Sequence, residues 1–237
     1  MMRTSLSLAV AVAAAIASPA VAQDNPYGGG SRLDRDTADV ERSPGNLNQQ
    51  DRARATLDQY ARCMIKKQRA TATKFVESPP WTETAKAELD RMVDERCLST
   101  GELSFPADLL RGAVFQELYR EKYSGGPPAL PAAAIDFTDG AQGPLGDTAA
   151  VQVAMLQFGD CVARRDLPNS HALVLARPGT SQETSAINAL LPDFAACLVQ
   201  GSTWKITKSV MASIMSEVLY REGDVAKAPI LAGGSAH

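Results

Sequence analysis

The chain has 237 residues, of which 45% are hydrophobic, and its formal charge is −3. Neither the total charge nor any local run supplies the basic surface that a nucleic-acid-binding protein needs, so nucleic acid is excluded as a main partner. The chain contains two histidines and four cysteines, and their spacing matches no metal-ligand pattern. We therefore expect no bound metal and no other cofactor, and we assign no residue to catalysis.

The first residues have the pattern of a secretory signal peptide. A positive charge at Arg3 precedes an uncharged, largely apolar run over residues 6–16, and Ala20 and Ala22 form a small-x-small cleavage site. The apolar run is shorter than the roughly 20 residues that a membrane-spanning helix needs. We expect residues 1–22 to be removed on export, leaving a periplasmic or secreted protein that does not insert into a membrane.

An internal repeat organises the rest of the chain. At an offset of 98 residues, the apolar and basic pattern of residues 53–67 recurs at 151–165. At an offset of 101, the tetrad Leu-Tyr-Arg-Glu at 118–121 recurs at 219–222. Matched patterns in the same order over such lengths predict a duplicated unit. The expected domains are a flexible arm at 23–48, a first helical repeat at 49–123, a Gly/Pro/Ala-rich linker at 124–146, a second helical repeat at 147–224 and a C-terminal tail at 225–237.

Within each unit, apolar residues recur with the period of an α-helix and predict four helical segments. The segments lie at 49–67, 70–76, 82–98 and from 106 in the first unit, and at 147–165, 168–176, 181–199 and from 207 in the second. Pro192 is expected to kink or split the helix that contains it. Short equivalent segments end at Phe105 and Ile206, and a twofold axis could pair them as a minimal two-stranded ribbon. The expected fold class is all-α, with two tandem disulfide-closed helical repeats packed as a pseudo-twofold domain.

The four cysteines occupy the same frame in both units. Cys63 and Cys97 are separated by 34 residues, and Cys161 and Cys197 by 36. Four cysteines allow three connectivities, and spacing alone does not choose among them. The duplication favours Cys63–Cys97 and Cys161–Cys197, because a unit that once folded alone had only its own two cysteines to pair.

Five side chains are candidates for binding another molecule. Trp81 follows a Ser-Pro-Pro segment and either covers the start of its helix or forms an exposed contact. Arg120 and Arg221 occupy equivalent positions; the favoured interpretation is that each lies at the negative end of a helix dipole, and the alternative is a paired anion clamp. Met211 and Met215 belong to an apolar stripe that lines either the core or a cavity between the repeats.

The charge of the two units differs by a factor of about two. Residues 51–124 contain 13 basic and 12 acidic side chains, whereas residues 148–224 contain 6 and 7. Deeper burial of the second unit is the favoured explanation, and an interaction surface is the alternative.

Three functions remain open on the sequence alone. The favoured one is an exported, non-catalytic interaction protein of the cell envelope, with a protein partner or a homodimer. The first alternative is a binder of lipids or other apolar molecules, with a cavity lined by Met211, Met215, Leu190 and Phe194. The weaker alternative is an enzyme that uses carboxylate or tyrosine chemistry, because His171 has no nucleophile or carboxylate at a catalytic spacing in the sequence.

Overall fold

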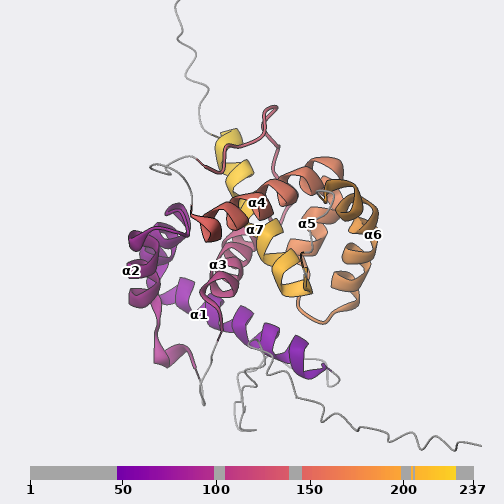
Figure 1. Cartoon of the computed structure of the whole chain (residues 1–237). Coiled ribbons are helices and arrows are strands. Elements are labelled where there is room, and N and C mark those ends of the chain that lie inside the picture. Colours follow the sequence, from indigo (N-terminus) through magenta and orange to yellow (C-terminus); the bar gives the residue numbers. More distant parts are fainter. Residues whose placement is uncertain (1–46, 99–104, 139–145, 199–203, 205, 228–237) are drawn as a thin grey trace, which may run out of the picture.

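The computed structural model describes residues 47–98, 105–138, 146–198, 204 and 206–227. These residues form seven α-helices and one short 3₁₀ helix, and no strand is found among them (Figure 1). The expected signal peptide and nearly all of the expected N-terminal arm lie outside the described residues. The all-α class is therefore confirmed for the part of the chain that the structure covers.

The first helix, α1 (Gln49–Glu77), joins two segments that the sequence analysis separates. Asn48 caps it, because its side chain accepts a hydrogen bond of 2.8 Å from the backbone N–H of Asp51. The expected break between residues 67 and 70 is only a kink at Gln68, where φ is −137°. In the second half the chain does break, at Asp166 between α4 (Asp147–Arg165) and α5 (Leu167–Leu175). Gln68 and Asp166 are 98 residues apart, the offset of the sequence repeat.

The single helix expected over residues 82–98 is wrong. The chain forms α2 (Glu83–Met92), leaves the helical conformation at Val93 and Asp94, and continues as the 3₁₀ helix η1 (Glu95–Cys97). The break is held from both sides: the Tyr60 hydroxyl accepts a hydrogen bond of 3.1 Å from the Asp94 N–H, and the Asp94 carboxylate accepts the N–H of Arg96.

Of the kink or split expected at Pro192, the split is wrong, because α6 (Ser181–Cys197) runs through this proline. Proline removes one backbone hydrogen bond, to the carbonyl of residue 188. Asn188 lies on the exposed side of the helix, so water can bind the freed carbonyl. Thr180 caps the start of α6 by accepting the N–H of Glu183.

Two helices form the centre of the molecule. α3 (Ala107–Tyr123) packs most extensively against α7 (Lys208–Lys227), and every residue of α3 from Leu110 to Arg120 is buried. The two helices come closest at Gly112, where an added Cβ would lie 2.7 Å from the Cα of Ser213. Gly112 therefore permits the crossing, because a side chain there would meet backbone.

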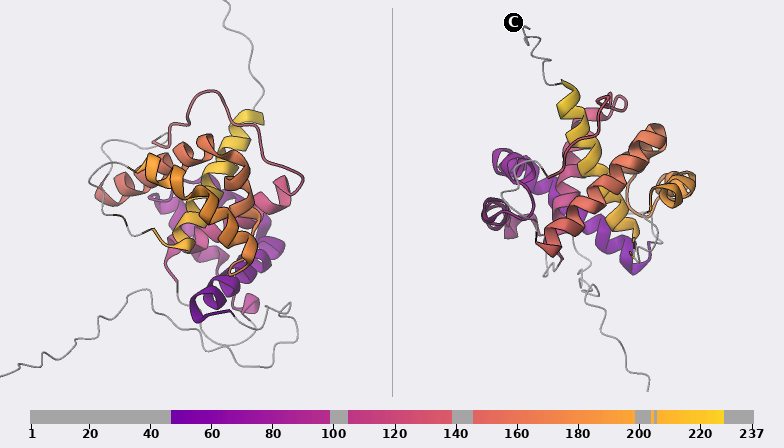
Figure 2. Two further views of the ribbon diagram at one scale, coloured as in Figure 1. Left: turned by 90° about the vertical axis from the view of Figure 1, so that its right-hand side faces the viewer. Right: turned by 45° about the horizontal axis from the view of Figure 1, so that its top comes forward.

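The other helices lie on either side of this central pair. α1 packs on α3 and carries α2, whereas α4 and α5 pack on α7 and carry α6. As a result α2 and α6 lie at opposite ends of the molecule, with α3, α4 and α7 between them (Figures 1 and 2). One apolar core belongs to α1, α2 and the first part of α3; the other joins α4 to α7 with the end of α3 and with Phe137 of the linker.

The expected disulfide pairing is confirmed. Cys63 on α1 is bonded to Cys97 of η1, with a Cα–Cα distance of 5.6 Å. Cys161 on α4 is bonded to Cys197 at the end of α6, at 5.9 Å. Each bond ties an outer helix to the long helix that precedes it, and no cysteine is free.

Two expected boundaries need comment. α7 continues to Lys227, so the helical part of the second unit ends three residues beyond the expected limit at 224. Phe105 and Ile206 are not part of a strand, and the neighbouring positions 103, 104 and 205, on which the expected ribbon depends, lie outside the described residues.

Candidate functional site

Arg120 lies in a buried ionic network between the two halves. Its guanidinium bonds the Asp58 carboxylate of α1, and its Nε and Nη2 donate to the carbonyls of Val174 and Ala176 at 3.1 and 2.6 Å. Arg177 contacts the same Asp58 at 2.8 Å, and Glu117 lies within the network. Desolvation lowers the pKa of the buried Arg120 below its ordinary value. Its donors are thus used to join α3 to α1 and to the end of α5.

Arg221, the arginine of the second Leu-Tyr-Arg-Glu tetrad, has a different environment from Arg120. It is half-buried, donates to Glu217 at 2.7 Å and lies over the ring of Phe115. Glu217 also binds Arg111, whose Nη1 and Nη2 donate to the carbonyls at the end of α1. The structure therefore places Arg120 and Arg221 in separate carboxylate networks and does not bring them together.

The apolar candidates belong to packed surfaces. Trp81 is partly buried and, although it lies in the first half, packs against the core of the second. Met215 is 1% exposed and belongs to the same core as Leu190 and Phe194, whereas Met211 is partly buried against it.

Tyr119 and His171 form a contact that the sequence analysis missed. The Tyr119 hydroxyl lies 2.7 Å from His171 Nδ1, and its ring packs against that of Tyr123. Burial raises the pKa of Tyr119 and lowers the pKa of His171, so a neutral phenol donating to a neutral imidazole is the stable arrangement. The residues are 52 positions apart, so only the packing of α3 against α5 reveals the pair.

Asp160 and Glu222 form a buried carboxyl pair around Arg164. Arg164 donates to Asp160 at 2.8 Å and to Glu222 at 2.7 Å, and its remaining donors bind the carbonyls of Pro131 and Ala133 in the linker. Glu222 is fully buried, and this desolvation, with the neighbouring Asp160, raises its pKa to about 8. Arg164, held by the two carboxyl groups, thus joins the linker to α4 and α7.

The outer face of α6 is exposed and carries no charge. We call nine exposed residues the α6 face, eight of them on the helix and the last its C-cap: Thr184, Ser185, Asn188, Ala189, Leu191, Pro192, Ala195, Ala196 and Leu198. Leu191 and Leu198 are 53% and 39% exposed. Glu183 is buried and bound to Arg54 of α1, and Asp193 pairs with Arg165 of α4 at 2.8 Å. On α6, therefore, the low charge of the second unit lies at the surface and not in a buried contact.

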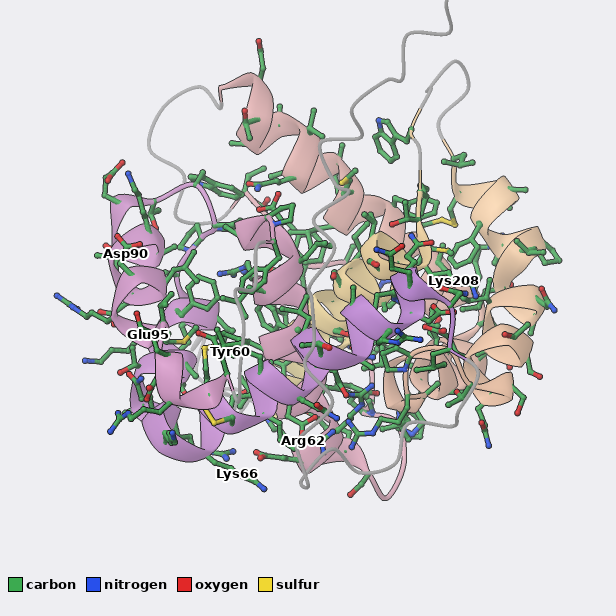
Figure 3. The ribbon with its side chains drawn as sticks, turned by 90° about the horizontal axis from the view of Figure 1, so that it is seen from below. Tyr60, Arg62, Lys66, Asp90, Glu95 and Lys208 are labelled. Carbon is green, nitrogen blue, oxygen red and sulfur yellow. A yellow bond between two sulfur atoms is a disulfide. The ribbon has the colours of Figure 1, made fainter. Side chains whose placement is uncertain are left out.

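The corresponding part of the first half is highly charged. Residues 69–98 contain eleven charged side chains, whereas residues 167–198 contain three. Asp90 and Glu95 lie at the outer edge of the molecule, and Tyr60 lies further inside (Figure 3). The sequence signal for the α6 face was thus the local scarcity of charged residues in 167–198. The count of charged residues over the whole second unit does not reveal it.

No protein-family model matches the chain, and comparisons with curated proteins and with solved structures found no similar protein. Within the described ranges, no group of three or more histidine, cysteine or carboxylate side chains could hold a metal ion. No described helix combines the length and the apolar character that crossing a bilayer requires.

Proposed function

We propose that this chain is an exported, non-catalytic interaction protein, built from two related helical units, that binds a protein chain through the α6 face. The observation that carries the proposal is the absence of charge from the nine exposed residues of the α6 face. Surfaces that remain in water normally carry charged side chains, and their depletion is typical of the centre of a protein interface.

The duplicated origin is supported by features that recur at the repeat offsets. The kink at Gln68 and the break at Asp166 are 98 residues apart, and Gly112 and Ser213, which meet where α3 crosses α7, are 101 apart. Equivalent residues that face each other at a helix crossing are what a pseudo-twofold axis between two units produces.

Export is supported by the disulfides together with the N-terminal pattern. Two disulfides join all four cysteines. Such bonds persist in the periplasm or outside the cell and are rare in a reducing cytosol. A cleaved signal peptide is tested by N-terminal sequencing of the exported protein, which should begin at Gln23.

The binding role is tested by a pair of variants at positions 91 and 191, which are treated as equivalent because they are 100 residues apart, the separation of Cys97 and Cys197. Leu191→Arg places on α6 the side chain that α2 carries at Arg91, and Arg91→Lys alters α2 without adding or removing charge. Wild type and Arg91→Lys are expected to retain the same partner chain after chemical cross-linking in the native compartment, and Leu191→Arg should lose at least tenfold of it. Equal capture by all three proteins would refute a role for the α6 face.

A further inference from the structure

The α6 face contains a stripe with the spacing of a coiled-coil seam. Thr184, Asn188, Leu191, Ala195 and Leu198 are all exposed and are separated by four, three, four and three residues. This alternation repeats every seven residues and keeps the stripe on one side of a helix that packs along another helix. Leu191 lies at the centre of the stripe, with two members on either side.

The absence of charge from this face permits a second copy of the chain as its occupant. A twofold dimer places the same patch of both copies in contact, so any charged residue near the axis meets its own like charge. The α6 face has no such residue, whereas the equivalent surface of α2 and η1 exposes Arg91, Glu95 and Arg96. Of the two, only the α6 face can meet itself without like-charge repulsion or the burial of an unpaired ion.

Asn188 adds a polar contact that suits this arrangement. It occupies the seam position at which a single asparagine commonly fixes the register of a coiled coil. Its amide carries both donor and acceptor atoms, so two copies of the side chain can bond each other when they meet. The Asn188 side chain is exposed, so its amide is accessible to a second copy.

We infer that two copies of this chain associate through α6, with the two helices parallel and their stripes packed face to face along a twofold axis, so that Leu191 meets Leu191 and Asn188 meets Asn188 of the second copy. This inference rests on the proposed function, whose contact surface it uses. The stripe spans about 21 Å at 1.5 Å per residue. A single helix contact of that length lies at the small end of specific interfaces, so the dimer should be weak, with a dissociation constant on the order of 10–100 μM.

The test is sedimentation equilibrium of the exported protein, with its disulfides intact, from about 1 to about 500 μM, which brackets the expected constant. The wild-type mass should rise from one chain toward two across this range. Leu191→Lys and Leu191→Glu should each remain monomeric, because like charges meet at the axis, and an equimolar mixture of the two should recover the dimer. Arg91→Glu, at the equivalent position of α2, should dimerise as the wild type does.

Each other outcome overturns the inference. A wild type that stays monomeric excludes self-association, and a dimer that survives Leu191→Lys uses another surface. Failure of the mixture to recover excludes the twofold arrangement, provided that circular dichroism shows both variants folded. The cross-linking comparison distinguishes failure of the dimer from failure of the proposed function. If wild type captures a different protein and Leu191→Arg does not, the α6 face binds that protein and only the dimer is refuted.

Discussion

The α2–η1 segment and α6 lie at opposite ends of the molecule and present opposite surfaces. Each is the outermost element of its half and is joined by a disulfide to the long helix before it. At an offset of 100 residues, exposed Arg91 and Glu95 in the first half correspond to exposed Leu191 and Ala195 in the second. The comparison shows that both halves keep a disulfide at the outermost element, while the exposed residues of the two outermost elements differ in charge.

The largest difference between equivalent residues is expected for the two arginines of the repeated tetrad. Arg120→Ala leaves the buried Asp58 and Glu117 carboxylates and two carbonyls with fewer partners, and should lower the free energy of unfolding by about 3–5 kcal/mol. Arg221→Ala removes a half-buried ion pair and should cost about 1 kcal/mol or less. Urea unfolding measures both, and equal losses would contradict the different burial of the two sites.

The two disulfides should, in contrast, contribute almost equally. They close segments of nearly the same length, with separations of 34 and 36 residues. The chain-entropy argument gives about 3–4 kcal/mol for loops of this size. Replacing Cys63 and Cys97 by alanine, or Cys161 and Cys197, should therefore lower stability by similar amounts. A difference of more than about 2 kcal/mol would show that one half depends on its bond for more than loop closure.

Glu222 and its equivalent Glu121 should differ in their effect on the pH dependence of stability. The fold raises the pKa of Glu222 to about 8, so it favours the protonated form, and the associated stability is complete below the ordinary pKa near 4.5. That stability is lost as the pH rises toward about 8, by an amount of at most about 5 kcal/mol.

The matched variants are Glu222→Gln and Glu121→Gln. Glu222→Gln should become increasingly stable relative to wild type as the pH rises from about 5 to about 8, because glutamine does not ionise. Glu121 is exposed, so Glu121→Gln should follow the wild-type curve. Parallel curves for Glu222→Gln and wild type in thermal unfolding would show that Glu222 is already ionised in the folded protein.

The smallest effect on stability is expected from exchanging the exposed residues at positions 91 and 191. Leu191→Arg and Arg91→Leu both change exposed side chains, and each should alter the free energy of unfolding by no more than about 0.5 kcal/mol. Chemical denaturation at a protein concentration below about 5 μM, where the proposed dimer is dissociated, measures this effect. A loss above about 2 kcal/mol in Leu191→Arg would mean that Leu191 supports the fold and not an interface.

Local sequence signals predicted much of this fold because helices and loop closure depend on nearby residues. Period and capping located most of the helices, and the duplicated frame selected the correct cysteine pairs. The continuity of α6 through Pro192 and the break at Val93 were not predictable. The first depends on which carbonyl faces water, and the second depends on a hydrogen bond from Asp94 to Tyr60, 34 residues earlier.

The candidate site was predictable only in outline. The low charge of the second unit was visible in the sequence, but its position on the surface was not, because an uncharged helix face looks the same whether it is buried or exposed. The Tyr119–His171 contact and the pair of Asp160 with Glu222 join separate helices, and such contacts require the packing to be known.

The crossing of α3 and α7 at Gly112 and Ser213 limits how far the two halves can change independently. With the backbones so close, the two positions share one small space, and growth of either side chain must be matched at the other. A bulkier residue at Gly112 would push the central helices apart and loosen both cores at once. The two halves can therefore acquire different surfaces at their ends, but a substitution at their shared centre changes the packing of both.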